Sequence, residues 1–122
     1  MQVIDAVIER ADVLSEQELD ELPIGMVQLD RSGRILKFNR TESELGGTAK
    51  ENAIGRSFFD EVAPCTRVRE FHGRFLEGVE KRELHVIFPY RFQFRDVRQK
   101  DVMITMFYSV ATDSVWVLVD RP

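Results

Sequence analysis

Val115-Trp116-Val117-Leu118-Val119 is a run of five consecutive apolar residues near the end of a 122-residue chain. A strand with one face in water alternates apolar and polar side chains, whereas a strand covered on both faces has apolar residues throughout. This run therefore predicts a strand that is central in its sheet, with helices packed on both faces.

The segment before this run predicts a second strand with apolar residues on both sides. In residues 102–110, Val102, Ile104, Met106 and Tyr108 fall on one side of the strand and Met103 and Phe107 on the other. Because apolar side chains are most stable away from water, we expect cover on both faces here too.

A third strand is predicted around residues 88–94, where aromatic residues alternate with mostly polar ones. Phe88, Tyr90, Phe92 and Phe94 form the aromatic side. Pro89 has no backbone N–H to donate, so this strand is expected at an edge of the sheet or with a bulge.

The first half of the chain predicts two strands, at 24–30 and 34–38, joined by a turn at Gly33. A short helix follows, with Asn39 as its N-cap and Gly46-Gly47 as its end. Single helical turns are expected at 48–55 and 58–62. A longer helix is expected over 69–84, with Phe71, Phe75, Leu76 and Val79 on its apolar side.

Residues 1–22 predict an N-terminal helical cap made of two short helices, and residues 23–122 one further domain. Apolar residues recur at helical spacing from Val3 to Leu14, and Ser15-Glu16-Gln17-Glu18 has the pattern of a capping box. This segment either covers an apolar face of the sheet or docks a partner or a second copy of the chain.

Composition narrows the classes of function. The net charge of −4 provides no overall field that would attract nucleic acid. No apolar run is long enough to cross a membrane, and no signal peptide is evident, so a cytoplasmic location is expected. A single cysteine excludes an internal disulfide. His72 and His85 are isolated and are expected to be surface or core residues rather than metal ligands.

The single cysteine lies in Ser57-Phe58-Phe59-Asp60-Glu61-Val62-Ala63-Pro64-Cys65-Thr66, directly after a proline and behind an aromatic pair. This stretch resembles the photoactive yellow protein family, and the resemblance runs from about Ile24 to Asp96 and, after one deleted position, to Val119. Other matching pieces are Gln28-Leu29-Asp30, Gly33-Arg34-Ile35-Leu36, Ile54-Gly55, Phe75-Leu76-Glu77-Gly78-Val79 and Trp116-Val117.

The resemblance implies an α+β protein with the PAS fold. Such a fold is a five-stranded antiparallel sheet with short helices on one face, and here the N-terminal helical cap would lie on the other. It also implies a site in which Cys65 holds p-coumaric acid as a thioester. Glu42 matches the buried glutamate that, when protonated, hydrogen-bonds the phenolate of that chromophore, and Phe92 with Phe58 or Phe59 would supply an aromatic wall.

Each of these residues also has a plainer interpretation. Free cysteine packs as a small apolar residue, so Cys65 can be an ordinary core residue. Glu42 can be a solvated residue of a helix. The aromatic residues can belong to the core whatever the ligand is.

Three positions depart from the family pattern. The tyrosine that binds the phenolate falls on Phe38, the threonine that supports the hydrogen bonds falls on Gly46, and the arginine that covers the pocket falls on Thr48. A hydrogen bond to a charged group contributes roughly 1.5–3 kcal/mol, so Phe38 alone is expected to raise the pKa of a bound phenol by roughly one to two units. Absorption would then move towards the near ultraviolet.

Two functions of different classes remain from the sequence. One is a blue or near-ultraviolet light sensor in bacterial signalling, with p-coumaric acid on Cys65. The other is a PAS interaction module without the light chemistry, which forms a homodimer or binds a signalling partner through its N-terminal helix or sheet face, or holds another small aromatic ligand.

Other functions have little support from the sequence. No enzymatic motif, phosphate-binding loop or nucleic-acid platform is evident. A row of basic residues near the end of the third strand is expected to be a solvated edge or, less in keeping with the net charge, a patch for an acidic partner; it comprises Arg91, Arg95, Arg98 and Lys100.

Overall fold

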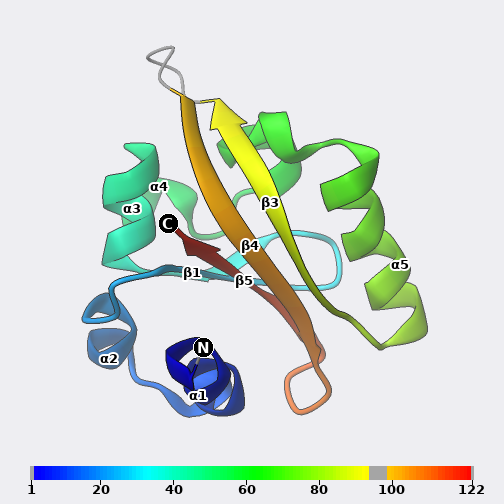
Figure 1. Cartoon of the computed structure of the whole chain (residues 1–122), viewed down its shortest axis with the longest axis horizontal. Coiled ribbons are helices and arrows are strands. Elements are labelled where there is room, and N and C mark those ends of the chain that lie inside the picture. The colour runs from blue at the N-terminus through cyan, green and yellow to red at the C-terminus, as the bar shows by residue number, and fades with distance from the viewer. Residues whose placement is uncertain (1, 94–98, 122) are drawn as a thin grey trace.

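The computed structural model describes residues 2–93 and 99–121. Within these ranges the chain forms a five-stranded antiparallel sheet in the order β2-β1-β5-β4-β3, with helices on both faces (Figure 1). The strands are β1 (Gly25–Leu29), β2 (Ile35–Phe38), β3 (His85–Gln93), β4 (Gln99–Ser109) and β5 (Ser114–Asp120).

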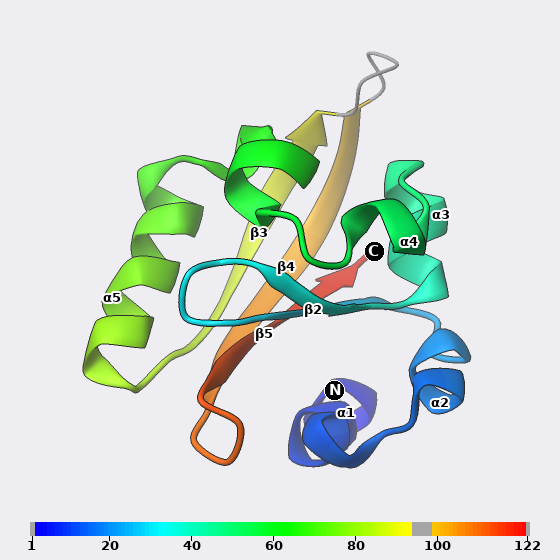
Figure 2. The same ribbon diagram turned by 180° about the vertical axis from the view of Figure 1, so that it is seen from behind.

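The helical elements are short. They are α1 (Gln2–Arg10), η1 (Ala11–Val13), α2 (Glu16–Asp20), α3 (Arg40–Gly46), α4 (Lys50–Ala53), η2 (Phe58–Val62), η3 (Pro64–Thr66), η4 (Arg69–Gly73) and α5 (Arg74–Lys81). Figure 2 shows α3, α4, α5 and the turns between them over one face of the sheet, and α2 beside α3 at the sheet's edge. α1 packs against the other face.

β5 is the central strand, as its apolar run predicts. Val115, Val117 and Val119 belong to the larger core, which the helices after β2 cover. Trp116 and Leu118 point the other way, into a second core formed with the N-terminal helices. None of the five is more than 1% exposed, so both faces of the strand are sealed.

The N-terminal helical cap forms as its sequence predicts. Ser15 and Glu18 make the capping box that starts α2, with Glu18 N–H donating to Ser15 Oγ and Ser15 N–H donating to Glu18 Oε1. Val7, Ala11, Leu14 and Leu19 are buried in the second core against Met26, Phe107, Trp116 and Leu118. Because cap and sheet share this core, the division of the chain after residue 22 stays a prediction.

Asp12 joins the N-terminal helical cap to the hairpin between β4 and β5. The indole N–H of Trp116 donates to Asp12 Oδ1 at 2.8 Å, and the hydroxyl of Thr112 donates to the same atom at 3.2 Å. The Ser109 hydroxyl donates to Asp12 Oδ2. One carboxylate thus accepts hydrogen bonds from three residues about 100 positions away, and it satisfies the only polar atom of a fully buried indole.

Most other element predictions are confirmed. Asn39 caps α3, Gly47 ends it with φ of 72°, and Gly33 makes the β1–β2 turn with φ of 89°. β3 is an edge strand, in keeping with Pro89. Phe94 lies outside the described residues.

Three expectations are wrong. The helix predicted over 69–84 begins with a wide π turn and ends at Lys81, because Arg82 takes a left-handed conformation and Leu84 folds back onto Gly78, where a side chain would collide with it. Leu76 is 52% exposed, since no element within the described ranges covers that side of α5. Met103 is 42% exposed, because the N-terminal helical cap extends over Phe107 but not over the far end of β4.

Asp12→Ala should lower the free energy of unfolding by about 1–3 kcal/mol, because the buried Trp116 indole N–H loses its acceptor. Glu9→Ala, at an exposed position of α1, is the matched control and should change it by less than about 0.5 kcal/mol. Urea unfolding followed by circular dichroism measures both. Equal effects of the two substitutions would contradict this role of Asp12.

Candidate functional site

A cavity of about 610 Å³ opens between α3, α4, the turn before Cys65 and the end of β3. Its walls include six of the residues that the sequence singles out: Phe38, Glu42, Gly46, Thr48, Cys65 and Phe92. The volume lies within the roughly 300–1,000 Å³ of typical small-molecule sites.

Glu42 is the most unusual group in this cavity. It is 6% exposed, and its Oε1 atom has no hydrogen-bond partner among the described residues. Burial raises the pKa of Glu42 from 4.5 to about 7, because a charged carboxylate is costly without water or a partner. The interpretation of Glu42 as a solvated helix residue is therefore wrong.

Gly25 makes room for this carboxyl group. A Cβ atom at position 25 would lie 2.1 Å from Glu42 Oε1, well inside van der Waals contact. The glycine of β1 and the glutamate of α3 thus occupy a space that would otherwise hold a side chain from the strand. Any larger residue at position 25 would have to displace the carboxyl group.

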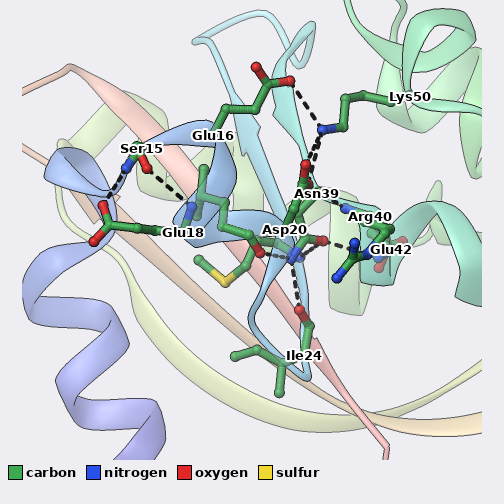
Figure 3. A network of polar contacts seen from close by, with 11 residues as sticks. Ser15, Glu16, Glu18, Asp20, Ile24, Asn39, Arg40, Glu42 and Lys50 are labelled. Carbon is green, nitrogen blue, oxygen red and sulfur yellow. Dashed lines mark hydrogen bonds and ion pairs between the residues drawn. The ribbon is translucent and has the colours of Figure 1, made fainter.

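Asn39 holds the helix that carries Glu42. Its Oδ1 atom accepts from the backbone N–H groups of Glu42 at 3.0 Å and Met26 at 2.9 Å, and its Nδ2 donates to the carbonyls of Leu19 at 2.7 Å and Ile24 at 3.0 Å (Figure 3). Asn39 is only 1% exposed. One amide therefore links α3 to both β1 and the N-terminal helical cap.

Cys65 is half-buried and lies on the cavity wall in the short turn η3. Pro64 starts that turn. The hydroxyl of Tyr90 on β3 donates to the carbonyl of Cys65, and Thr66 Oγ1 donates to the carbonyl of Ala63 at 2.6 Å. These bonds hold the turn against the sheet and so fix the backbone from which the thiol projects.

At the two positions Phe38 and Gly46, the cavity wall has no polar side-chain group. Phe38 is 4% exposed and offers a ring without a hydroxyl, while Gly46 has no side chain. Phe58 and Phe59 do not line the cavity, so the expected wall from one of them is wrong. They instead pack in the core with Phe71 and Phe75, with ring centroids 5.0–6.1 Å apart.

Four polar residues that sequence reasoning did not single out also line the cavity: Asn52, Arg56, Glu61 and Gln93. Arg56 and Glu61 form a loose ion pair at 3.7 Å. Arg56 and Glu61 lie in segments next to residues that the sequence singles out. Alternation and motif spacing do not show which polar side chains point into the cavity.

The other candidates contribute nothing to this cavity. His72 packs against the ring of Phe59, and no group of three or more metal-ligating side chains occurs in the described part of the chain. Arg91 pairs with Asp101 at 2.7 Å on an exposed edge, whereas Arg95 and Arg98 lie outside the described residues. Among the described helices, none has the length and apolar character to cross a bilayer.

Comparison with known proteins agrees with the fold. The model of the PAS fold matches residues 14–119. The chain is 39% identical over 108 residues to photoactive yellow protein of Halochromatium salexigens, covering 88% of this chain and 86% of that one. It is 37% identical over 105 residues to photoactive yellow protein of Cereibacter sphaeroides, covering 86% and 84%.

A solved structure agrees equally well. The photoactive yellow protein domain of the sensor histidine kinase Ppr from Rhodospirillum centenum superposes with a TM-score of 0.87 at 41% identity, over 93% of this chain and 98% of that domain. With this level of identity over most of both chains and this close superposition, the chain belongs to the photoactive yellow protein family of PAS-fold sensory domains.

Proposed function

We propose that the chain is a light-sensing signalling domain that holds p-coumaric acid as a thioester on Cys65. The observation that carries this is the buried Glu42, whose Oε1 atom has no hydrogen-bond partner among the described residues and which lines the same cavity as Cys65. A polar atom that is buried without a partner is costly, so its presence indicates a group that completes it. We assign the chain a sensory rather than an enzymatic role and expect it in the cytoplasm.

The cavity fits the proposed group. Glu42 can donate a hydrogen bond while it is protonated, and its raised pKa keeps a large part of it protonated near neutral pH. Cys65 lines the same cavity and can form the thioester bond with an activated form of the acid. When bound, p-coumaric acid would supply the absorption of light.

The chain's own residues then determine the state of the bound phenol. Phe38 and Gly46 have no side-chain donor, so Glu42 takes a larger share of the stabilisation of a phenolate than in the family pattern. Loss of one hydrogen bond to a charged group raises the phenol pKa by roughly one to two units. We therefore expect a protonated, near-ultraviolet form to be prominent.

A second function, an interaction module, is favoured by an apolar patch on the sheet. Ile87 is 59% and Met103 42% exposed, and both lie on the face that carries Phe107, beyond the reach of the N-terminal helical cap. A second copy of the chain or a signalling partner could cover them. This function does not depend on a ligand.

The first test is chemical. Activated p-coumaric acid should add to the protein once, as read by intact mass, and should not add to Cys65→Ala. Phe38→Tyr should move the absorption to longer wavelength and lower the phenol pKa by roughly one to two units, whereas Phe38→Leu adds no donor and should not. An adduct that does not respond to light, or no adduct, would favour the interaction module.

The second test concerns Glu42 without any ligand. Its pKa is raised from 4.5 in the unfolded chain to about 7 in the folded one, so the folded state binds the proton more tightly. The stability contribution is full below about pH 4.5 and is lost as the pH rises to about 7, a change of roughly 3 kcal/mol.

Glu42→Gln should remove this dependence, whereas Glu44→Gln, at an exposed position of the same helix, should keep it. Urea unfolding at several pH values between 4.5 and 8 measures the difference. Parallel stability profiles of the wild type and Glu42→Gln would show that Glu42 ionises normally.

The third test concerns the patch. If the chain forms homodimers through the sheet face, light scattering should give twice the mass of one chain, and the Ile87→Lys/Met103→Lys double variant should halve it. Leu76→Lys, at an exposed apolar position on α5, is the control and should leave the mass unchanged. If light scattering gives the wild-type protein the mass of one chain, the homodimer is excluded.

A further inference from the structure

Asp20 lies where the N-terminal helical cap meets both helices that wall the cavity. Lys50 Nζ donates to Asp20 Oδ2 at 2.7 Å and Oδ1 at 2.9 Å, and to Glu16 Oε2 at 3.1 Å. The backbone N–H of Arg40 donates to Asp20 Oδ1 at 2.8 Å. Figure 3 shows these groups together beside Asn39.

The partners of Asp20 begin the two cavity helices. Arg40 is the first residue of α3, which carries Glu42, and Lys50 is the first residue of α4. Thr48 and Ala49, immediately before Lys50, line the cavity, as does Asn52 one turn later. A displacement of α2 would therefore act on α4, which is part of the cavity wall, through the bonds of Lys50 to Asp20 and Glu16.

The Lys50–Asp20 pair is better placed to transmit force than an ordinary surface ion pair. Their side chains are 22% and 24% exposed, in contrast to 61% and 67% for Lys81 and Glu77 on α5. Burial raises the pKa of Asp20, but the hydrogen bonds from Lys50 and the Arg40 backbone outweigh it and leave a net lowering. The pair is thus held in its charged, bonded form near neutral pH.

Asp12 fixes the other end of the same segment without touching the cavity wall. Among the described residues, its side chain accepts from Ser109, Thr112 and Trp116. None of these partners lines the cavity. The N-terminal helical cap is thus held to the sheet by Asp12 and the second core, and to the helices of the cavity wall by Asp20 and the Asn39 amide. The polar contacts of Asp12 and of Lys50 can be removed separately.

We infer that Lys50 is a positioning residue that couples docking of the N-terminal helical cap to the closure of the cavity around Cys65. When the cap is docked, the bridge to Asp20 and Glu16 holds α4 in place. When the cap leaves the sheet, α4 loses that support and the thiol becomes more accessible. Because such coupling is reciprocal, closing the cavity also favours docking of the cap.

The single thiol provides the test, and no ligand is needed. The rate at which DTNB modifies Cys65 is measured in native buffer and normalised to the rate in urea-unfolded chain. Lys50→Met should raise the normalised rate roughly three- to tenfold, the size expected for loss of a partly buried ion pair. Lys50→Arg keeps the charge and should restore a rate near that of the wild type. Lys81→Met is the matched control and should change nothing.

The coupling itself is read from a double-variant cycle. Asp12→Ala should raise the rate in the chain that has Lys50, and should add little in the Lys50→Met background. If Asp12→Ala does not fold, Asp12→Asn, which keeps one carbonyl acceptor for the Trp116 indole, takes its place.

Two outcomes would overturn the inference. Lys50→Met could leave the rate at the wild-type value, or the effects of Asp12→Ala and Lys50→Met could multiply, which means that they act independently. Failure of Lys50→Arg to restore the rate would also count against the inference, because the positive charge at position 50 would then not be what holds α4 in place. All of these results are separate from whether p-coumaric acid binds, since the assay uses the free thiol.

Discussion

Burial of β5 on both faces is the constraint on which the rest of the structure depends. A strand of five apolar residues in the middle of a sheet needs two covers, and the chain makes them from different segments. The N-terminal helices cover one face with aliphatic side chains. The helices after β2 cover the other, and there the cover is incomplete and leaves the cavity. The sheet thus separates a well-packed side from a side with space for a ligand.

On the cavity side, the position of the polar groups is fixed by neighbouring residues that few other residue types could replace. Asn39 uses both ends of its amide to fix the start of α3, and Gly25 leaves the space that the Glu42 carboxyl fills. Burying that carboxyl group costs free energy, which the packing of the surrounding core offsets. Such local cost in an otherwise well-satisfied protein is typical of sites that act on a ligand.

The sequence predicts the elements and the cavity residues well because both depend on local pattern or on family resemblance. Alternation identifies the strands, and six of the singled-out residues line one cavity, whereas Phe58 and Phe59 do not. The sequence does not show which elements extend far enough to cover or contact a given side chain. Periodicity shows that Leu76 and Met103 lie on apolar sides, but not that no neighbour extends over them. Asp12, Asp20 and Lys50 look like ordinary surface residues in the sequence. The sequence does not show that Asp12 bonds to neutral side chains about 100 positions away, or that Lys50 pairs with Asp20.

The single tryptophan of the chain points to the packed side of the sheet, and its neighbours Val115 and Val117 point to the other. The fluorescence of Trp116 therefore depends on whether the N-terminal helices shield the indole from water. The absorption of a chromophore bound to Cys65, as proposed, would depend on the opposite face of the sheet. Trp116 is therefore an intrinsic reporter of one side of β5, and the rearrangement of the N-terminal helices can be followed by its emission without adding a label. With the proposed chromophore on Cys65, the order in which the two sides rearrange could be followed in the same sample.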